Sequence, residues 1–160
     1  FLESTGGSTG GGTETPPATE ETLTGKTYTF ANYPKGSTSY TGGEEHVLDS
    51  DLTVTVYNKA FFTTQLRLYN SESTDYPDAH AILKFGKAVT KLQLNAGYKD
   101  NATLKIWVSN DGTNWTALPN VACSAAYAKK TVDLGGSYTY VKLQAAPQIR
   151  IIYMIIDFKK

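Results

Sequence analysis

The residue types that could carry nucleophilic catalysis are few in this sequence. Cys123 lies in the small-residue run VACSAAYA, and the two histidines are His46 and His80. Nothing in the spacing brings either histidine to the thiol, and the alternation in AHAILKF turns His80 towards solvent. A lone cysteine among small residues is typical of a small buried thiol. We therefore expect no catalytic triad. Three-histidine and four-cysteine metal sites are excluded, since the sequence holds two histidines and one cysteine.

Carboxylates occur in close pairs, and glycoside hydrolysis uses two carboxylates facing each other across a cleft, one with a raised pKa. The pairs are Glu44 with Glu45, Asp49 with Asp51, and Asp75 with Asp78. These acids lie in stretches expected to be turns, where Asp commonly bonds to nearby backbone groups. We therefore expect that the chain is not an enzyme, and hydrolysis is the least supported alternative.

Aromatic side chains are the richest signal for binding. The sequence has 11 Tyr against 6 Phe, and tyrosine combines a flat apolar face with a polar tip. The alternation in TLKIWVS turns Trp107 outward, where a loop of the chain, a partner or a sugar could cover it. A sugar ring would stack on such an aromatic ring while arginine or asparagine bonds to its hydroxyls. The candidate ligand-binding residues are Trp107, Tyr69, Arg67, Asn70, Tyr40 and Tyr76.

The elements that must hold these residues are β-strands. Runs rich in Val, Ile, Thr and Tyr alternate with period two at a spacing of about 8–12 residues, which indicates an all-β sandwich or barrel. The alternation leaves one face of each strand apolar, as in antiparallel sheets with one face on the core. We predict an all-β fold, an antiparallel two-sheet β-sandwich of the jelly-roll type. The side chains predicted to face inward are Leu52, Val54, Leu66, Leu68, Leu92, Leu104, Ile106, Val141 and Leu143.

One segment carries a family resemblance. Residues 104–118, LKIWVSNDGTNWTAL, read as two strands joined by a tight turn at Asn110-Asp111-Gly112, with Trp115 closing the hairpin. With YVKL at 140–143 and IRIIYMIIDF at 149–158, this segment resembles the galactose-binding-like jelly rolls of bacterial cell-surface proteins, which include discoidin-type and carbohydrate-binding modules.

The resemblance also implies a cofactor, because related jelly rolls often hold a structural calcium ion between an early loop and the final strand. The matching acids of this sequence are Glu44, Glu45, Asp49, Asp51 and Asp157. Calcium takes oxygen ligands of this kind. Solvated acids without a metal are the alternative, and no other cofactor is expected.

The first 24 residues, rich in Gly, Thr and Pro, differ from the rest. They hold four glutamates and neither lysine nor arginine. Such a composition predicts a flexible tether (1–24) ahead of the β-sandwich domain (25–160). The whole chain has 15 basic and 15 acidic residues, which excludes a general electrostatic binder of nucleic acid. No apolar stretch approaches the ~20 residues that span a membrane.

A tether before a compact β domain is typical of surface modules. We therefore expect a non-catalytic binding module, extracellular or anchored at the cell surface, with a lipid anchor upstream of residue 1 as one means of attachment. Its expected role is carbohydrate binding or adhesion, with a glycan or a cell-surface protein as partner. The alternative is a structural or assembly module that contacts another protein through a Tyr-rich face.

Overall fold

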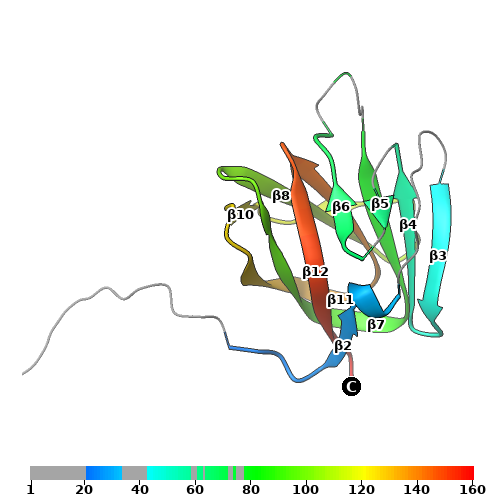
Figure 1. Cartoon of the computed structure of the whole chain (residues 1–160). Helices are drawn as coiled ribbons and strands as arrows, with labels where there is room; N and C mark the ends of the chain where they lie inside the picture. Colours follow the sequence, from blue (N-terminus) through cyan, green and yellow to red (C-terminus); the bar gives the residue numbers. More distant parts are fainter. Residues whose placement is uncertain (1–20, 34–42, 59–60, 63, 72–73, 75–77) are drawn as a thin grey trace, which may run out of the picture.

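The chain is built from antiparallel β-strands, as the alternation predicts. The computed structural model describes residues 21–33, 43–58, 61–62, 64–71, 74 and 78–160 (Figure 1). Within these residues the only helix is the short 3-10 turn η1 (Phe30–Asn32). The all-β prediction is confirmed. The described strands are β2 (Lys26–Thr29), β3 (Gly43–Asp49), β4 (Leu52–Tyr57), β5 (Phe61–Phe62), β6 (Leu66–Leu68), β7 (His80–Tyr98), β8 (Ala102–Ser109), β9 (Thr116–Ala117), β10 (Val121–Cys123), β11 (Ala128–Ala146) and β12 (Ile149–Phe158).

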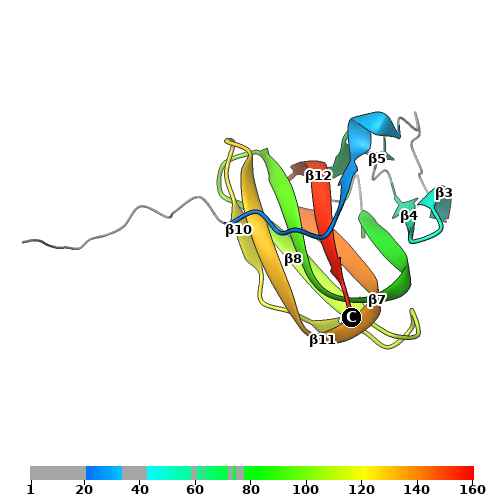
Figure 2. The same ribbon diagram turned by 90° about the horizontal axis from the view of Figure 1, so that it is seen from below.

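Two long strands, β7 and β11, connect the two layers of the sandwich. Residues 80–85 of β7 pair with β4 and with the last part of β11, and β8 lies beyond β11. Residues 89–98 of β7 pair instead with β12 and with residues 128–133 of β11. We call these the first half and the second half of the sheet. The first half also includes β3, β9 and β10, and the second half includes β2, β5 and β6. Figure 2 shows the resulting curled sheet from below.

The bend of β11 falls at residues 134–137. Its register with β7 shifts between Asp133 and Tyr138. Gly135, within the bend, has φ 73°, in the left-handed region that a residue with a Cβ atom enters only at a cost. On β7, the Gly86 N–H leaves the strand ladder and donates to the carbonyl of Asp51 at 3.0 Å. These bends allow two strands of 19 residues each to serve both halves.

The inner faces of the two halves meet in one hydrophobic core. Ile106 and Val141 from the first half belong to the same buried cluster as Leu92 and Met154 from the second. Burial of this apolar surface is the main term that stabilises such a fold. The predicted core is confirmed, since each of its members is at most 1 % exposed: Leu52, Val54, Leu66, Leu68, Leu92, Leu104, Ile106, Val141 and Leu143.

Residues 21–24, at the end of the predicted tether, cross the outer face of the second half. Gln93 of β7 is fully buried beneath them. Its side-chain nitrogen donates to the carbonyl of Glu21 at 2.7 Å, and its side-chain oxygen accepts from the Leu23 N–H at 3.5 Å. The contacts of the sandwich therefore extend to residue 21. The rest of the predicted tether, residues 1–20, lies outside the described residues.

Candidate functional site

Trp107 lies on the outer face of β8, where the alternation places it. Ile106 and Val108 beside it are buried, whereas Trp107 is partly exposed. Lys142 on β11 and Ala117 on β9 are its direct cross-strand partners. The same line of cross-strand pairs continues from Lys142 across β7, β4 and β3. We call the resulting line of outward side chains the Trp107 row: Glu45, Thr55, Ile82, Lys142, Trp107 and Ala117.

The ammonium group of Lys142 lies between two indole rings. Its Nζ atom is 4.7 Å from the centre of the Trp107 ring and 5.2 Å from that of Trp115. Trp115 also meets Tyr140 edge to face, with ring centres 6.4 Å apart. Cation–π contacts of this kind hold a lysine close to an aromatic surface. The side chain of Lys142, from the same sheet, therefore covers part of the Trp107 ring, and the rest of the ring is exposed to solvent.

The turn that carries Trp115 is held by the carboxylate of Asp111. Its Oδ1 atom accepts the backbone N–H groups of Thr113 and Asn114 at 2.8 Å each and the Ser109 hydroxyl at 2.9 Å. These bonds favour the charged form and hold the pKa of Asp111 well below its ordinary value. The structure thus contains the turn predicted at residues 110–112. The hydrogen bonds of this turn fix the position of Trp115, which follows it.

A second aromatic contact lies on the same outer face. The rings of Tyr57 and His80, opposite each other on β4 and β7, stack with centres 4.5 Å apart. The Nδ1 atom of His80 is 2.6 Å from the carbonyl oxygen of Asp78, to which its N–H donates. Burial lowers the pKa of His80, although the Asp78 carbonyl acts in the opposite direction. His80 is therefore a neutral, positioned ring at neutral pH rather than the solvated histidine that the alternation suggests.

The predicted ligand-binding residues do not form one group. Trp107 belongs to the first half, whereas Arg67 lies on β6 in the second half. Asn70 follows β6 and forms a bridge with Ala145 of β11. Tyr69, between them in sequence, is partly exposed. The other two candidates, Tyr40 and Tyr76, lie outside the described residues. The roles of all six in binding stay predictions.

The residues considered for catalysis lie on different elements. Cys123 on β10 is 5 % exposed, and burial raises the pKa of its thiol, which is the opposite of activation. His46 on β3 contacts the carboxylate of Glu44 at 3.1 Å. His80 is engaged with Asp78 and Tyr57. Among the described residues, Cys123 therefore lies on a different strand from both histidines, with β8 and β11 between β10 and β7.

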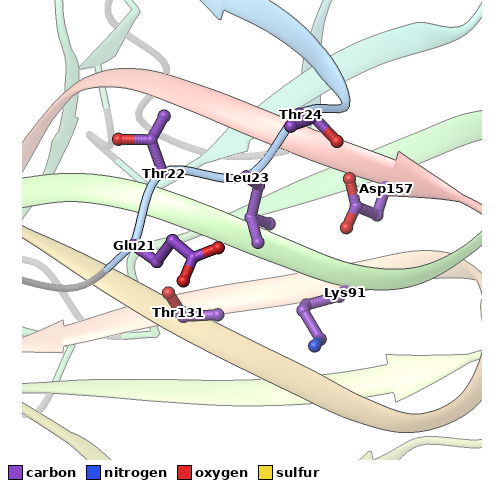
Figure 3. A pocket seen from close by; sticks show the side chains of 7 residues that line it. All are labelled: Glu21, Thr22, Leu23, Thr24, Lys91, Thr131 and Asp157. Carbon is purple, nitrogen blue, oxygen red and sulfur yellow. The ribbon is translucent and has the colours of Figure 1, made fainter.

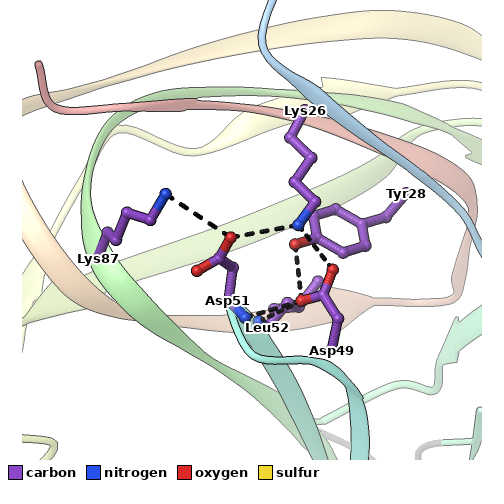
Figure 4. A network of polar contacts seen from close by, with 6 residues as sticks. All are labelled: Lys26, Tyr28, Asp49, Asp51, Leu52 and Lys87. Carbon is purple, nitrogen blue, oxygen red and sulfur yellow. Dashed lines mark hydrogen bonds and ion pairs between the residues drawn. The ribbon is translucent and has the colours of Figure 1, made fainter.

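Asp49 and Asp51, two of the implied calcium ligands, are joined to Lys26 (Figure 4). The Lys26 Nζ atom lies 2.8 Å from Asp49 and 3.2 Å from Asp51. Asp49 also accepts the Tyr28 hydroxyl at 3.0 Å and the N–H groups of Asp51 and Leu52. Burial alone would raise the pKa of Asp49, but Lys26 and these donors outweigh it and lower the pKa. The Lys26 ammonium group therefore already balances the charge of the two carboxylates that a calcium ion would have to bind.

The other three acids implied for calcium lie elsewhere. Glu44 contacts His46, Glu45 is in the Trp107 row, and Asp157 faces Lys91 across β12 and β7. Within the part of the chain that the structure describes, no three His, Cys, Asp or Glu residues gather closely enough to hold a metal ion. The five residues therefore do not fit one calcium site, because the fold separates them and supplies a lysine partner to two.

A cavity of about 510 Å³ lies on the outer face of the second half, beside the segment 21–24 (Figure 3). Sequence reasoning missed it, because it forms only when the N-terminal segment crosses β7, β11 and β12. Both Lys91 and Asp157 contribute charged groups to its wall, so it suits polar rather than apolar occupants. Its lining residues are Glu21, Thr22, Leu23, Thr24, Lys91, Thr131 and Asp157.

Sequence reasoning also missed the part that Lys142 plays. The alternation of YVKL, with Val141 and Leu143 inward, was sufficient to place Lys142 outward. What the sequence did not show is the strand order, which puts β11 beside β8 and Lys142 opposite Trp107. Neighbours across a sheet are set by register, and register is a property of the whole fold.

Comparisons with known proteins agree with this architecture. No protein-family model and no curated protein sequence matches the chain. Among solved structures, CpGH89CBM32-6, produced by Clostridium perfringens, superposes with a TM-score of 0.51 at 14% identity, over 72% of this chain and 100% of that one. CpGH89CBM32-5 from the same organism, in complex with GalNAc-β-1,3-galactose, gives a TM-score of 0.47 at 14% identity, over 81% and 98% of the two chains.

In the described residues, no helix has the length and apolarity needed to cross a membrane. The fold predicted from the 104–118 segment is confirmed by the superposition with CpGH89CBM32-6. The chain has the β-sandwich fold of CpGH89CBM32-6.

Proposed function

We propose that the chain is a non-catalytic carbohydrate-binding module that holds a glycan on the outer face of the first half. The observation that carries this proposal is the Trp107 row, in which a partly exposed indole lies opposite an ammonium group. Trp107 offers an apolar ring to the C–H face of a sugar. Lys142 lies within reach of a hydroxyl on a sugar stacked there.

The rest of the Trp107 row supports a sugar better than a purely apolar ligand. Thr55 supplies a hydroxyl and Glu45 an exposed carboxylate, with Ile82 between them and Lys142. Strands lie about 4.8 Å apart, so the row extends across several strands as a narrow path. A short oligosaccharide could follow this path, with one residue on the indole and the next beside Ile82 and Thr55.

The fold supports the same class of function without establishing it, because one fold hosts many functions. CpGH89CBM32-6, with which the chain superposes, is by its name a carbohydrate-binding module. The absence of catalysis is supported by the buried thiol of Cys123 with its raised pKa. We place the module outside the cell, where polysaccharides are accessible.

Binding to a panel of neutral oligosaccharides tests this proposal. We expect at least one galactose-, N-acetylgalactosamine- or glucose-containing glycan to bind, and Trp107→Ala to weaken its binding by about tenfold or more, since aromatic contacts contribute on that scale. Tyr127→Ala is the matched control, because Tyr127 is an exposed aromatic residue away from the Trp107 row. Thermal unfolding of each variant separates loss of binding from loss of structure.

Two results would count against the proposal. One is that no glycan binds the intact chain, and the other is that Tyr127→Ala reduces binding as much as Trp107→Ala. A solution mass that rises with concentration and falls on Trp107→Ala would instead indicate that this face binds protein. Of the described tyrosines, only Tyr127 reaches 36% exposure. The described tyrosines therefore give the protein-contact alternative little exposed surface.

A further inference from the structure

The Trp107 row crosses the first half from one edge to the other. It begins at Ala117 on β9 and ends at Glu45 on β3, and its members lie on neighbouring strands throughout. Each member is partly or fully exposed, so a ligand can contact every position of the row. The row is therefore much longer than the single indole ring of Trp107 that begins the glycan site.

Both ends of the row are exposed. In the described part of the chain, β3 pairs only with β4 and β9 pairs only with β8, so no further strand continues the row. Glu45 and Ala117 are themselves exposed. A sugar chain that lies on the row can therefore continue past both ends. A site for the end of a sugar chain would instead need a wall beyond the last sugar.

The spacing of the strands sets how many sugars the row can hold. Neighbouring strands lie about 4.8 Å apart, so the steps from Trp107 across β11, β7 and β4 to Glu45 cover about 19 Å. An extended chain of pyranose rings advances by a similar length per residue. This part of the row thus offers about four successive sugar positions, the first at Trp107 and the last at Glu45.

The charges of the row favour a sugar chain without charge. Lys142 carries a positive charge near one end, and Glu45 carries a negative charge at the other. A chain with a carboxylate on every sugar would meet the like charge of Glu45, and a chain with an ammonium group on every sugar would meet that of Lys142. Neutral hydroxyl groups suit both residues, because they donate to the carboxylate and accept from the ammonium.

Aromatic side chains stand on both sides of the row. Tyr57 and His80, whose rings stack with centres 4.5 Å apart, are each two residues from a member of the row on the same strand. On the other side, Tyr140 is two residues before Lys142 and meets Trp115 edge to face. Residues two apart on a strand face the same way and lie about 7 Å apart, so these rings border the row. A branch on a bound sugar chain would meet them.

We propose that the Trp107 row binds an internal stretch, about four sugars long, of a linear and neutral polysaccharide that lies across the strands. One sugar stacks on Trp107 beside Lys142, the following sugars lie over Ile82 and Thr55, and the last donates hydroxyl protons to Glu45. This inference rests on the proposed function and deepens it, because it names the class of glycan and the direction in which the chain lies.

The dependence of affinity on chain length tests this proposal. The probes are cello-oligosaccharides and linear galactan oligosaccharides of two to six residues, titrated into the full chain by calorimetry. In the series that binds, we expect the tetramer to bind about tenfold more tightly than the dimer, the scale of one or two additional hydrogen bonds. The pentamer and the hexamer should add little, because the tetramer already fills the row.

Variants at the Glu45 end of the row locate the added affinity. Glu45→Gln and Thr55→Val should each weaken binding of the tetramer by about three- to tenfold, the scale of one hydrogen bond. Both should leave binding of the dimer unchanged, because the dimer stays near Trp107, and Trp107→Ala should weaken both oligomers. Thr53→Val is the matched control, since Thr53 is a partly exposed threonine on the same strand and face but outside the row.

The number of protein molecules on one polysaccharide shows whether the interior of the chain is bound. The probe is a soluble linear polysaccharide of the same sugar and linkage as the oligomer that binds. We expect several copies of the protein on each polysaccharide molecule, measured by sedimentation. Saturation at one copy for each polysaccharide molecule would show that a chain end is bound, and it would overturn the proposal.

Failure of this proposal differs from failure of the proposed function. If the dimer binds through Trp107 as tightly as the hexamer, or if Thr53→Val is as harmful as Thr55→Val, the proposed function stands and the extended site is wrong. If neither series binds, the extended site is also wrong. Binding of another glycan through Trp107 then keeps the proposed function, and the absence of all glycan binding removes both. If a variant does not fold, the length series and the sedimentation of the intact chain still decide.

Discussion

Lys142 and Trp107 form a direct cross-strand pair, with the ammonium nitrogen 4.7 Å from the centre of the indole ring. The two residues are 35 positions apart in the sequence, and only the register of β11 on β8 brings them together. A cation held against an aromatic surface keeps its remaining donors directed to solvent. The ring and the ammonium can therefore bind one ligand together.

Lys142→Met tests this pairing. We expect glycan binding to weaken by about tenfold, because a hydroxyl partner is lost. The free energy of unfolding should fall by no more than about 1 kcal/mol, the scale of a partly exposed cation–π contact. Lys84→Met, on the same outer face but outside the Trp107 row, should leave glycan affinity unchanged. Equal affinity for the Lys142→Met variant and the intact chain would remove Lys142 from the site.

The burial of the core beneath the Trp107 row can be tested by truncating Ile106. Ile106, adjacent to Trp107, is 1 % exposed. We expect Ile106→Ala to lower the free energy of unfolding by about 2–5 kcal/mol, through lost burial and the cavity left behind. Ile82→Ala, which truncates a partly exposed isoleucine on the outer face, should cost clearly less. Urea unfolding measures both. A cost below about 1 kcal/mol for Ile106→Ala would contradict its place in the core.

The turn before Trp115 depends on glycine. Gly112 has φ 75°, and a Cβ atom there would lie 3.2 Å from the Tyr140 ring. We expect Gly112→Ala to cost at least about 1–2 kcal/mol from the left-handed backbone, plus the cost of displacing the ring. Gly135 has φ 73° but no atom within 4 Å of such a Cβ, so Gly135→Ala measures the backbone cost alone. Gly112→Ala should be the more harmful, and the reverse order would mean that the ring moves freely.

His80 makes the stability of the domain depend on pH. Its pKa in the folded chain is below the ordinary value of 6.5, mainly through burial. The unfolded chain therefore binds a proton more readily than the folded one. This contribution to stability is fully present above pH 6.5 and is lost as pH falls below that value. Urea unfolding on either side of pH 6.5 should show the fall, and His80→Gln should flatten it. An unchanged slope in His80→Gln would assign the effect to other groups.

The fold could be predicted from the sequence because it follows from the local alternation of apolar and polar residues. Leu104, Ile106 and Val108 alternate with polar or aromatic neighbours, and this pattern is enough to choose the buried face. The turn at 110–112 could be predicted as well, since Asn, Asp and Gly tolerate positive φ. Each of these inferences needs only residues close together in the sequence.

The sites could be predicted only in part, because they depend on which strands become neighbours. The alternation places Trp107 outward, as the structure does, but its pairing with Lys142 depends on the order of β8 and β11. The sequence offers both Arg67 and Trp107 as candidate ligand-binding residues, whereas the bends of β7 and β11 put the two in different halves of the sheet. The family resemblance implies Asp49 as a calcium ligand, whereas its lysine partner Lys26 comes from a strand outside the segments that carry the resemblance.

The two tryptophans allow the role of the Trp107 row to be measured directly, because Trp107 and Trp115 are the only indoles in the sequence. A neutral oligosaccharide that binds should change the tryptophan fluorescence of the intact chain and of Trp115→Phe in a saturable way. In Trp107→Phe the remaining indole should respond weakly or not at all, at glycan concentrations that saturate the intact chain. A full response in Trp107→Phe, with the response lost in Trp115→Phe, would contradict the account and move the glycan away from Trp107.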